Sequence, residues 1–285
     1  MRDAALQSLA VGFFDGVHLG HQAILKGADA ALTFRNHPLM ILAPEKAPRL
    51  IMSEEERVAA IKACGVKDVT VLEFTREFAE MSADEFACEY LLAAKGRKGA
   101  QRIRCGENWR FGKGGEGNAE WLRTKGIDVE VVPYAEYKGE TVSSSRIRRC
   151  LENGEIEDAN AMMGRRFQVS GSRFQGKGLG GRIGYPTVNL QLSTSTSSLH
   201  LPLGVYEVEV EGQKAIANYG LAPTMGDRAW SAPTMEIHFL HCPPPPLSST
   251  SVNVGLLRFI RKEMKFDFIE DLKRQIAADC AKITA

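Results

Sequence analysis

The chain has no closely paired cysteines, no long apolar run and almost no net charge, and each absence excludes a class of protein. Its six cysteines are scattered without a CxxC pair, so we expect neither a zinc ribbon nor a disulfide framework. No run approaches the roughly 18 apolar residues of a membrane span. A net charge of +1 favours neither a nucleic-acid nor a membrane partner. These features favour a reducing, cytoplasmic location, and they leave the oligomeric state unknown.

The first half of the sequence alternates between short apolar runs and segments that begin at helix-capping residues. This alternation is typical of a parallel α/β sheet with helices on both faces. Ligands of such sheets bind at the carboxyl ends of the strands. The expected strands are 9–14, 30–34, 66–72, 103–106 and 127–133, and the expected helices are 18–28, 53–64, 82–94, 118–125, 143–151 and 155–163.

The pattern changes near residue 165, where short β-type runs begin to alternate with glycine and proline. This texture predicts an antiparallel barrel or compact sheet, closed by an amphipathic helix over about 268–283. We therefore expect two domains, 1–165 and 166–285. The expected strands are 167–171, 188–192, 205–210, 214–219 and 235–240, and the low-complexity stretches 193–198 and 243–246 are expected to be loops.

The most informative segment follows the first expected strand. Asp15-Gly16 predicts a turn, and His18-Leu19-Gly20-His21 then opens a helix. Two imidazoles three residues apart share one helix face, near a helix N-terminus whose amide groups and dipole attract anions. Gly20 leaves room for a phosphate to approach the backbone. The segment therefore indicates a site that binds a nucleoside triphosphate and stabilises charge at phosphorus.

Residues 12–22, Gly-Phe-Phe-Asp-Gly-Val-His-Leu-Gly-His-Gln, resemble the signature of the nucleotidyltransferase superfamily. Their longer form resembles the start of bacterial bifunctional riboflavin kinase/FAD synthetases. The resemblance implies a doubly wound parallel-sheet nucleotidyltransferase domain, followed by a small antiparallel β-barrel flavokinase domain with a C-terminal helix. It implies that His18 and His21 are catalytic. The residues that it implies for ATP binding here are Gly12, Phe13, Asp15, Gly16 and Gly20.

Two further segments after expected strands resemble flavin-binding parts of this family. The segment 33–38 resembles a threonine-phenylalanine…histidine-proline motif on the flavin-phosphate side of the site. The segment 105–112 is an aromatic loop between two glycines, which suits stacking on a flat ring. The family usually carries an acidic residue and phenylalanine where Asn108 and Trp109 stand. The implied flavin-binding residues are His37, Pro38, Asn108, Trp109 and Phe111.

The segment 142–148, Val-Ser-Ser-Ser-Arg-Ile-Arg, places three hydroxyl groups at the start of an expected helix. Hydroxyls and free amides at a helix start can hold phosphates, and a guanidinium one turn later can clamp them. The segment resembles the second nucleotide motif of the family, with Ser145 in place of threonine. The resemblance implies that Ser143, Ser144 and Ser145 bind ATP and that Arg148 is a catalytic clamp.

In the second half, residues 176–189 combine repeated glycines with two cations, which can surround a phosphate. The GK[ST] ending of a P-loop is absent. The last six residues, Gly-Tyr-Pro-Thr-Val-Asn, resemble the flavokinase signature, which implies that Thr187 and Asn189 hold Mg²⁺ together with ATP phosphates. The implied ATP contacts are Gly176, Lys177, Gly178 and Arg182.

The segment 235–238, Met-Glu-Ile-His, resembles another kinase motif, which implies that Glu236 is the general base for the ribityl hydroxyl of riboflavin. The C-terminal residues Arg261, Glu263, Phe266, Leu272 and Asp279 match the closing pattern of the family, and Arg261 and Phe266 are the implied flavin contacts. One departure concerns the kinase half. Four prolines, 243–246, stand where the family has an acidic turn, so kinase activity is a weaker expectation than adenylyl transfer.

We therefore predict a two-activity enzyme with riboflavin, FMN and ATP as substrates and Mg²⁺ as cofactor. Three alternatives stay open. The chain could be a monofunctional FAD synthetase with a degenerate kinase module, a non-catalytic flavin-binding sensor, or an adenylyltransferase for a different phosphorylated acceptor. Product analysis from riboflavin and from FMN separates them.

Overall fold

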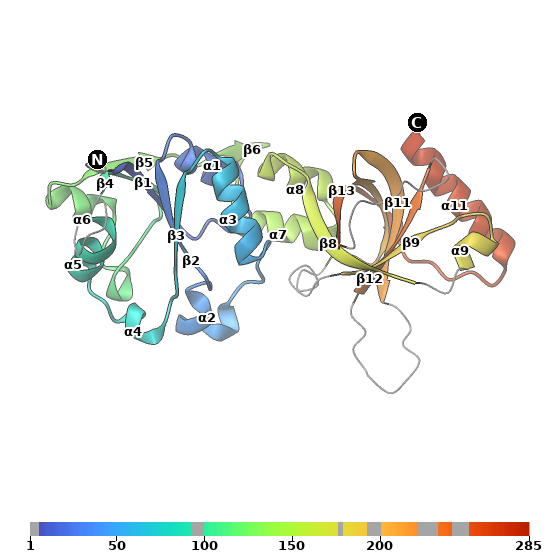
Figure 1. The fold of residues 1–285 in the computed structure, drawn as a ribbon, viewed down its shortest axis with the longest axis horizontal. Helices are drawn as coiled ribbons and strands as arrows, with labels where there is room; N and C mark the ends of the chain where they lie inside the picture. Colours follow the sequence, from blue (N-terminus) through green and yellow to red (C-terminus); the bar gives the residue numbers. More distant parts are fainter. Residues whose placement is uncertain are drawn as a thin grey trace. The chain divides into compact units, whose positions relative to one another are not determined.

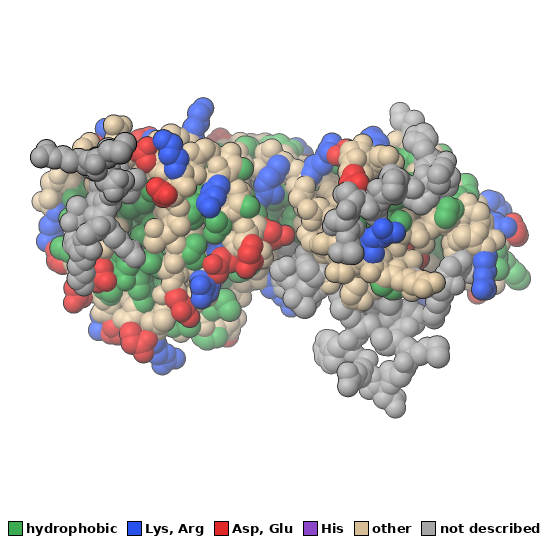
Figure 2. All heavy atoms as spheres, viewed as in Figure 1, with side chains coloured by type: hydrophobic (Ala, Val, Ile, Leu, Met, Phe, Trp, Pro, Cys, Tyr) green, Lys and Arg blue, Asp and Glu red, His purple; other side chains and the backbone are tan. Residues whose placement is uncertain are grey.

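The computed structural model describes residues 6–92, 100–175, 179–192, 201–221, 233–240 and 251–284. The chain divides into two compact units, Met1–Ser144 and Ser145–Ala285, and each is described by itself (Figure 1). The two stretches expected to be loops, 193–198 and 243–246, lie outside the described residues. On the face shown in Figure 2, positive and negative side chains are interspersed over each unit, which agrees with the balanced net charge.

The first unit contains a five-stranded parallel sheet with the order β3-β2-β1-β4-β5. From β1 the chain proceeds to β2 and β3 on one side and returns to β4 and β5 on the other. The order therefore reverses at β1, and ligands of such sheets bind at the strand ends beside this reversal. The strands are β1 (Leu6–Val11), β2 (Ala30–Phe34), β3 (Asp68–Leu72), β4 (Ala100–Gly106) and β5 (Asp128–Val132).

Helices cover both faces of this sheet because its strands are apolar on both sides. Leu9 and Val11 of β1 pack into one buried cluster with Phe86, whereas Ala10 packs into the other with Ile61. Figure 1 shows α1 and α3 on one side of the sheet and α5 and α6 on the other. The helices are α1 (Leu19–Leu25), α2 (Leu39–Leu42), α3 (Glu54–Ala63), α4 (Arg76–Ala79), α5 (Ala83–Phe86), η2 (Ala87–Leu91) and α6 (Ala119–Thr124).

Short elements complete the first unit, and some differ from expectation. The sequence did not predict α2, α4, the 3₁₀ turns η1 (Pro44–Lys46) and η3 (Lys113–Gly115), or the hairpin of β6 (Glu136–Tyr137) and β7 (Glu140–Thr141). These pieces are too short to show a hydrophobic period. The expected N-cap Ser53 before α3 and the expected capping box Ser82–Glu85 before α5 are confirmed. Ser53 also forms a full capping box with Glu56, which was not predicted.

The second unit begins with two helices and continues as a closed six-stranded antiparallel barrel with the order β10-β11-β12-β9-β8-β13. The fold class expected from the sequence is thus confirmed. The elements are α7 (Ser144–Asn153), α8 (Ile156–Met163), β8 (Phe167–Phe174), α9 (Leu179–Arg182), β9 (Val188–Leu192), β10 (Gly204–Val210), β11 (Gln213–Leu221), β12 (Pro233–Phe239), β13 (Ser251–Lys262) and α11 (Ile269–Thr284).

The C-terminal helix α11 packs along the barrel, as expected. Its Cys280 and Ile283 join a small apolar cluster with Val205 of β10 and Ile216 of β11. The longest strand, β13, was missed by the sequence analysis. It pairs with both β8 and β10, so it is the strand that closes the barrel.

Candidate active sites

The loop after β1 has a strained backbone at the point where the sheet order reverses. The strand was expected to reach Phe14 but ends at Val11, because the chain turns away there. Phe14 and Val17 have φ angles of 59° and 37°, and Gly16 has 79°. The left-handed region costs a β-branched residue about 1–3 kcal/mol. Such strain persists only where the surroundings enforce it, which is common at functional sites.

Hydrogen bonds from several segments enforce this conformation. Thr33 Oγ1 donates to the carbonyl oxygen of Phe13 at 2.9 Å. The buried carboxylate of Asp15 accepts the backbone N–H of Ile51 at 3.0 and 3.2 Å. Ser144 Oγ donates to the carbonyl oxygen of Asp15 at 2.8 Å. The Asp15 side chain therefore holds the loop in place.

The two histidines form a stacked pair at the start of α1. His18 is the N-cap residue, and its Nδ1 accepts the backbone N–H of His21 at 3.4 Å. The two rings lie 3.6 Å apart with an angle of 21° between their planes, and the edge of Phe14 contacts His21 at 5.4 Å. A Cβ atom on Gly20 would lie 3.3 Å from the His18 ring. The glycine thus leaves this face of the helix start open beside the imidazoles.

The pKa of His21 lies well below its ordinary value of about 6.5. Burial is the main cause, and the neighbouring His18 lowers the pKa further. His21 is therefore neutral near pH 7, with one ring N–H as a donor. Its Nδ1 is buried and has no hydrogen-bond partner within the described part of the chain.

The lowered pKa predicts how the stability of the first unit depends on pH. Between the folded-state pKa of His21 and about pH 6.5, the unfolded chain binds more protons than the folded one. We expect the stabilisation present above about pH 6.5 to be lost as the pH falls below that value. In His21→Gln this part of the pH dependence should disappear. Urea unfolding at about pH 7.5 and about pH 5.5 measures the free energy of unfolding. An equal loss of this free energy in the unaltered protein and in His21→Gln would contradict the role of His21.

The loop after β2 brings a second predicted residue against the loop after β1. The His37 ring meets the Phe13 ring edge-on at 4.8 Å. His37 Nδ1 accepts the N–H of Leu39 at 3.2 Å and so starts α2 directly after Pro38. The predicted ATP residue Phe13 and the predicted flavin residue His37 therefore form one continuous surface.

The loop after β4 stacks its two predicted aromatic residues on each other. The rings of Trp109 and Phe111 lie 4.7 Å apart. Phe111 is buried and packs against Phe86 at 5.3 Å, whereas Trp109 is partly exposed and Asn108 is exposed. Of the two rings, Trp109 is the one that is partly exposed, and Phe111 supports it from the core.

The serine-rich segment lies at the end of the first unit and the start of the second. Ser143 directly precedes α7, and Ser144 begins it. Arg148 lies one turn further along α7, in the second unit, where its Nη1 donates to Ser145 Oγ at 3.4 Å. These residues form the helix start that the sequence predicts.

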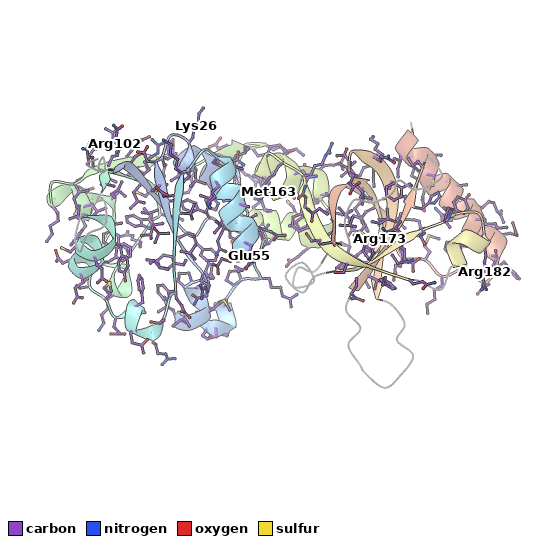
Figure 3. The ribbon with its side chains drawn as sticks, in the orientation of Figure 1. Lys26, Glu55, Arg102, Met163, Arg173 and Arg182 are labelled. Atoms are coloured by element: carbon purple, nitrogen blue, oxygen red, sulfur yellow. The ribbon has the colours of Figure 1, made fainter. Side chains whose placement is uncertain are left out.

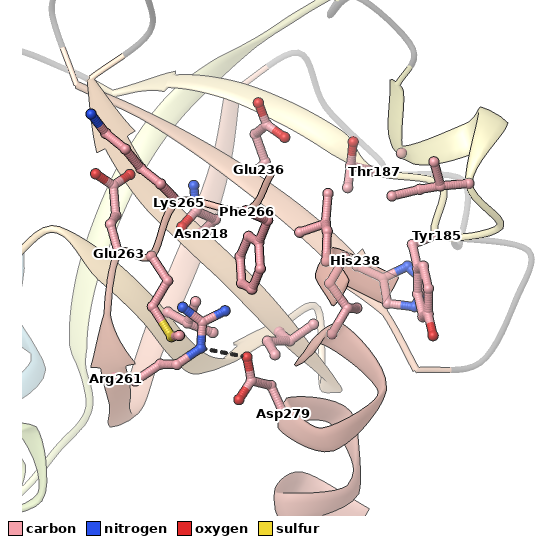
Figure 4. A pocket seen from close by; sticks show the side chains of 17 residues that line it. Tyr185, Thr187, Asn218, Glu236, His238, Arg261, Glu263, Lys265, Phe266 and Asp279 are labelled. Atoms are coloured by element: carbon pink, nitrogen blue, oxygen red, sulfur yellow. Dashed lines mark hydrogen bonds and ion pairs between the residues drawn. The ribbon is translucent and has the colours of Figure 1, made fainter. Parts of the chain in front are cut away.

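The barrel contains a cavity of about 530 Å³ (Figure 4). Four predicted residues that are far apart in the sequence line it together, namely Thr187, Glu236, Arg261 and Phe266. Figure 4 shows Glu236 and Thr187 toward one end of the cavity and Arg261 with Asp279 toward the other. The polar residues Asn218 and His238 also line it. The charged residues Glu263 and Lys265 line it as well. A cavity of this size that combines apolar surface with several polar side chains suits a small organic ligand.

A second cavity, of about 320 Å³, lies beside the first. Its lining includes Asn189 and Arg173, and Thr187 lines both cavities. In the strand register Glu236 of β12 stands opposite Asn189 of β9. A hydroxyl, an amide and a carboxylate therefore come together where the two cavities meet.

These oxygen donors fit Mg²⁺, which prefers oxygen ligands and often uses only one or two protein groups together with phosphate oxygens. Among the described residues, no group of three or more His, Cys, Asp and Glu side chains could hold a metal ion. Any cation held beside Thr187 would thus obtain most of its ligands from substrate and water.

A buried ion pair fixes one wall of the larger cavity. Arg261 Nε donates to Asp279 Oδ2 at 2.7 Å, and the Asp279 side chain is only 1% exposed. The other carboxylate oxygen accepts from Gln275 at 2.9 Å and from Lys282 at 3.3 Å. Asp279 thus ties the cavity wall to α11.

Removing this carboxylate should destabilise the barrel. We expect Asp279→Ala to lower the free energy of unfolding by about 3 kcal/mol, because it leaves a largely buried guanidinium without its partner. For a unit of this size that corresponds to roughly 10 °C in the melting temperature. Glu270→Ala, at an exposed position of the same helix, is the matched control and should change it by less than about 1 kcal/mol. Thermal unfolding compares them, and similar melting temperatures would contradict the role of Asp279.

Some predicted residues lie apart from these clusters or outside the described residues. Arg182, labelled in Figure 3, is an exposed residue of α9 and lines neither of the two cavities. The predicted ATP contacts Gly176, Lys177 and Gly178 lie outside the described residues.

The sequence predicted a role for neither His238 nor Arg57. The Nδ1 atom of His238 lies 3.0 Å from the carbonyl oxygen of Pro186, and its ring contacts Tyr185 at 5.2 Å. The alternation of β12 could have identified it, because residues two apart share a strand face and Glu236 was already chosen. The burial of Arg57 has no such sequence signal, because a basic residue in a helix rich in charged residues is expected to be exposed.

The first unit has the architecture of a nucleotidyltransferase, with its histidine pair at the strand ends where the sheet order reverses, and the second is a flavokinase-type barrel. The family model of FAD synthetase matches residues 2–146, and that of riboflavin kinase matches residues 163–285. The chain belongs to the family of bifunctional riboflavin kinases/FMN adenylyltransferases. The resemblance noted in the sequence is thereby confirmed.

Relatives match the chain over nearly its whole length. It is 30% identical to the bifunctional riboflavin kinase/FMN adenylyltransferase of Bacillus subtilis, covering 97% of this chain and 91% of that protein. It is 31% identical to the one of Escherichia coli K12, covering 95% and 90%. A solved structure, titled a macrolide-efflux protein from Streptococcus pneumoniae, has a TM-score of 0.83 at 29% identity and covers 97% of this chain and 93% of that one.

In the described parts of the chain, no helix combines the length and the apolar character that crossing a membrane requires.

Proposed function

We propose that this chain makes both flavin cofactors, using the barrel to phosphorylate riboflavin and the α/β unit to convert FMN to FAD. The observation that carries the proposal is the cavity of about 530 Å³, which Thr187, Glu236, Arg261 and Phe266 line together. All four residues lie within the range 163–285 that matches riboflavin kinase. The stacked His18 and His21 support the second reaction.

In the kinase reaction, Glu236 accepts the proton of the ribityl hydroxyl while that oxygen attacks the γ-phosphorus of ATP and ADP leaves. Arg261 and Phe266 hold the isoalloxazine in the larger cavity, and ATP occupies the smaller one beside Thr187. Gly176, Lys177, Gly178 and Arg182 are proposed for the ATP phosphates. Thr187 and Asn189 would hold Mg²⁺, which when bound offsets the charge of the phosphates.

In the adenylyl transfer, the FMN phosphate attacks the α-phosphorus of a second ATP and pyrophosphate leaves. This phosphate is already ionised near pH 7, so the reaction needs charge stabilisation more than a strong base. His18 and His21 donate to the reacting phosphate, together with the amides at the start of α1. Arg148 clamps the ATP phosphates. The remaining proposed ATP contacts are Gly12, Phe13, Asp15, Gly16, Gly20, Ser143, Ser144 and Ser145, of which Asp15 and Ser144 act by holding the loop after β1.

The flavin of this second reaction is proposed to bind between the loops after β2 and β4. Trp109 supplies the stacking face and Phe111 supports it, which fits the burial of Phe111. His37 and Pro38 border the phosphate end, and exposed Asn108 is available for hydrogen bonds to the ring edge.

We place the boundary between the two functional domains at 165/166. It is supported by the start of the riboflavin kinase match at residue 163 and of β8 at Phe167. We also propose a cytoplasmic location, with no nucleic-acid or membrane partner, on the composition described above.

One chromatographic assay, run with riboflavin and then with other acceptors, tests this proposal. The protein is incubated with riboflavin, ATP and Mg²⁺, and riboflavin, FMN and FAD are separated over time. We expect FMN to appear first and FAD to follow. FAD from added FMN, but no product from riboflavin, would indicate a degenerate kinase module. Riboflavin binding without ATP consumption would indicate a sensor, and ATP consumption only with another phosphorylated acceptor would indicate a different adenylyltransferase.

A further inference from the structure

Arg57 occupies a position where a helix normally places an apolar residue. It is 0% exposed and shares the buried face of α3 with Ile61, four residues further on. Burial lowers its pKa, and the nearby negative charges of Asp15, Glu54 and Glu55 oppose this shift. The group stays charged, because the pKa of a guanidinium lies far above neutral. A buried charge is costly, and a purely structural position would be filled better by an apolar side chain.

Arg57 contacts two segments of the candidate adenylyltransferase site directly, and a third through Phe13. Its Nη2 donates to the carbonyl oxygens of Phe34 and Arg35, the latter at 3.0 Å, at the carboxyl end of β2. Its guanidinium carbon lies 4.3 Å from the centre of the Phe13 ring, in the loop after β1. The Phe13 ring in turn contacts His37, in the loop after β2.

Arg57 cannot itself touch a substrate in this arrangement. Its Nε and Nη1 atoms are buried and have no hydrogen-bond partner within the described residues. The cation lies beneath Phe13 and acts only through the backbone and side chains above it. The contacts of Arg57 fix the geometry of its neighbours, because one planar guanidinium lies over the Phe13 ring and also donates to two carbonyl oxygens.

We propose that Arg57 is a positioning residue for adenylyl transfer, which sets the distance between the ATP-binding loop at Phe13 and the flavin-phosphate loop at His37. The inference rests on the adenylyl transfer proposed above. Two reacting phosphates must meet in line, and a displacement of about 1 Å can lower a rate roughly 100-fold. Loss of Arg57 therefore slows the chemical step more than it weakens the binding of either substrate.

The experiment compares Arg57→Met and Arg57→Lys with Arg104→Met. Arg104 is a matched control in the same unit, because it also donates to two backbone carbonyls, those of Ile24 and Ala23 at the other end of α1. FAD formation from FMN and ATP gives kcat and KM, and riboflavin phosphorylation by the same protein reports an intact second unit. Unfolding curves give the folded fraction. FAD formation by the unaltered protein tests the proposed function separately.

We expect Arg57→Met to lower kcat at least about 10-fold, with both KM values within about 2-fold and kinase activity unchanged. Arg57→Lys, which keeps the charge beneath Phe13, should recover part of this loss, and Arg104→Met should keep kcat within about 2-fold. Equal kcat losses in Arg57→Met and Arg104→Met, or a loss that the folded fraction accounts for, would overturn the proposal. If Arg57→Met does not fold, Arg57→Lys decides, and an unchanged kcat there overturns it.

Discussion

Replacing His21 by alanine should lower the rate of FAD formation from FMN and ATP by roughly 100- to 1,000-fold, or about 3–4 kcal/mol of transition-state stabilisation. His21 lies stacked on His18 at the start of α1, and it is held neutral by burial. A neutral ring that donates one N–H at this helix start is worth most in the transition state, when charge builds up on the transferred phosphorus. The chromatographic assay with FMN and ATP as substrates measures the effect.

The same preparation contains its own control. Riboflavin phosphorylation by His21→Ala should be unchanged, which shows that the loss is confined to one reaction. Lys26→Ala, at the exposed end of α1 (Figure 3), should keep both activities. Normal FAD output from His21→Ala would remove His21 from the mechanism.

Replacing Glu236 by glutamine should stop FMN formation while leaving FAD formation from added FMN intact. General-base catalysis of this kind contributes about 100- to 10,000-fold to a rate, and glutamine has the same shape without the basic oxygen. The carboxylate stands at the end of the cavity near Thr187, where the riboflavin hydroxyl and the γ-phosphate of ATP are proposed to meet. Initial rates of FMN formation from riboflavin measure the effect.

Binding separates a chemical role of Glu236 from a structural one. Glu236→Gln should still quench riboflavin fluorescence with an affinity within about 3-fold of the unaltered protein, since the flavin is held mainly by the apolar lining of the cavity. Glu270→Gln, an exposed acid on α11, should change neither binding nor rate. Undiminished kinase turnover in Glu236→Gln would rule it out as the base.

The elements that local patterns specify were predictable. The N-cap before α3 and the capping box before α5 involve residues within three positions of one another, and the alternating apolar runs of the first half indicate a parallel sheet. Local sequence patterns therefore suffice for these elements. The barrel strand β13 was missed, although Ser251, Asn253 and Gly255 alternate with Val252 and Val254. Its later residues, Leu256 to Lys262, break the alternation, and the register shifts against β10 show why.

The candidate sites were predictable as motifs and not as geometry. The spacing of His18 and His21 places both imidazoles on one helix face, and the stacking of their rings follows from that spacing and the N-cap position of His18. No local pattern could show that Phe111 is buried beneath Trp109, because burial depends on Phe86, a residue of another segment. Arg57 is the clearest case. A basic residue among charged neighbours at a helix start is expected to be exposed, and only the packing of α3 against the strands shows that it is buried.

The sequence by itself determined the two kinds of fold, the order of the domains and the residue types available for chemistry, because these depend on periodicity and on motifs of neighbouring residues. Tertiary structure alone decided which of them share a cavity, as Thr187, Glu236, Arg261 and Phe266 do. It also decided which charges are buried, as those of Arg57 and Asp279 are. The physical reason is that burial and distance are properties of several strands and helices packed together, and the local order of residues does not contain them.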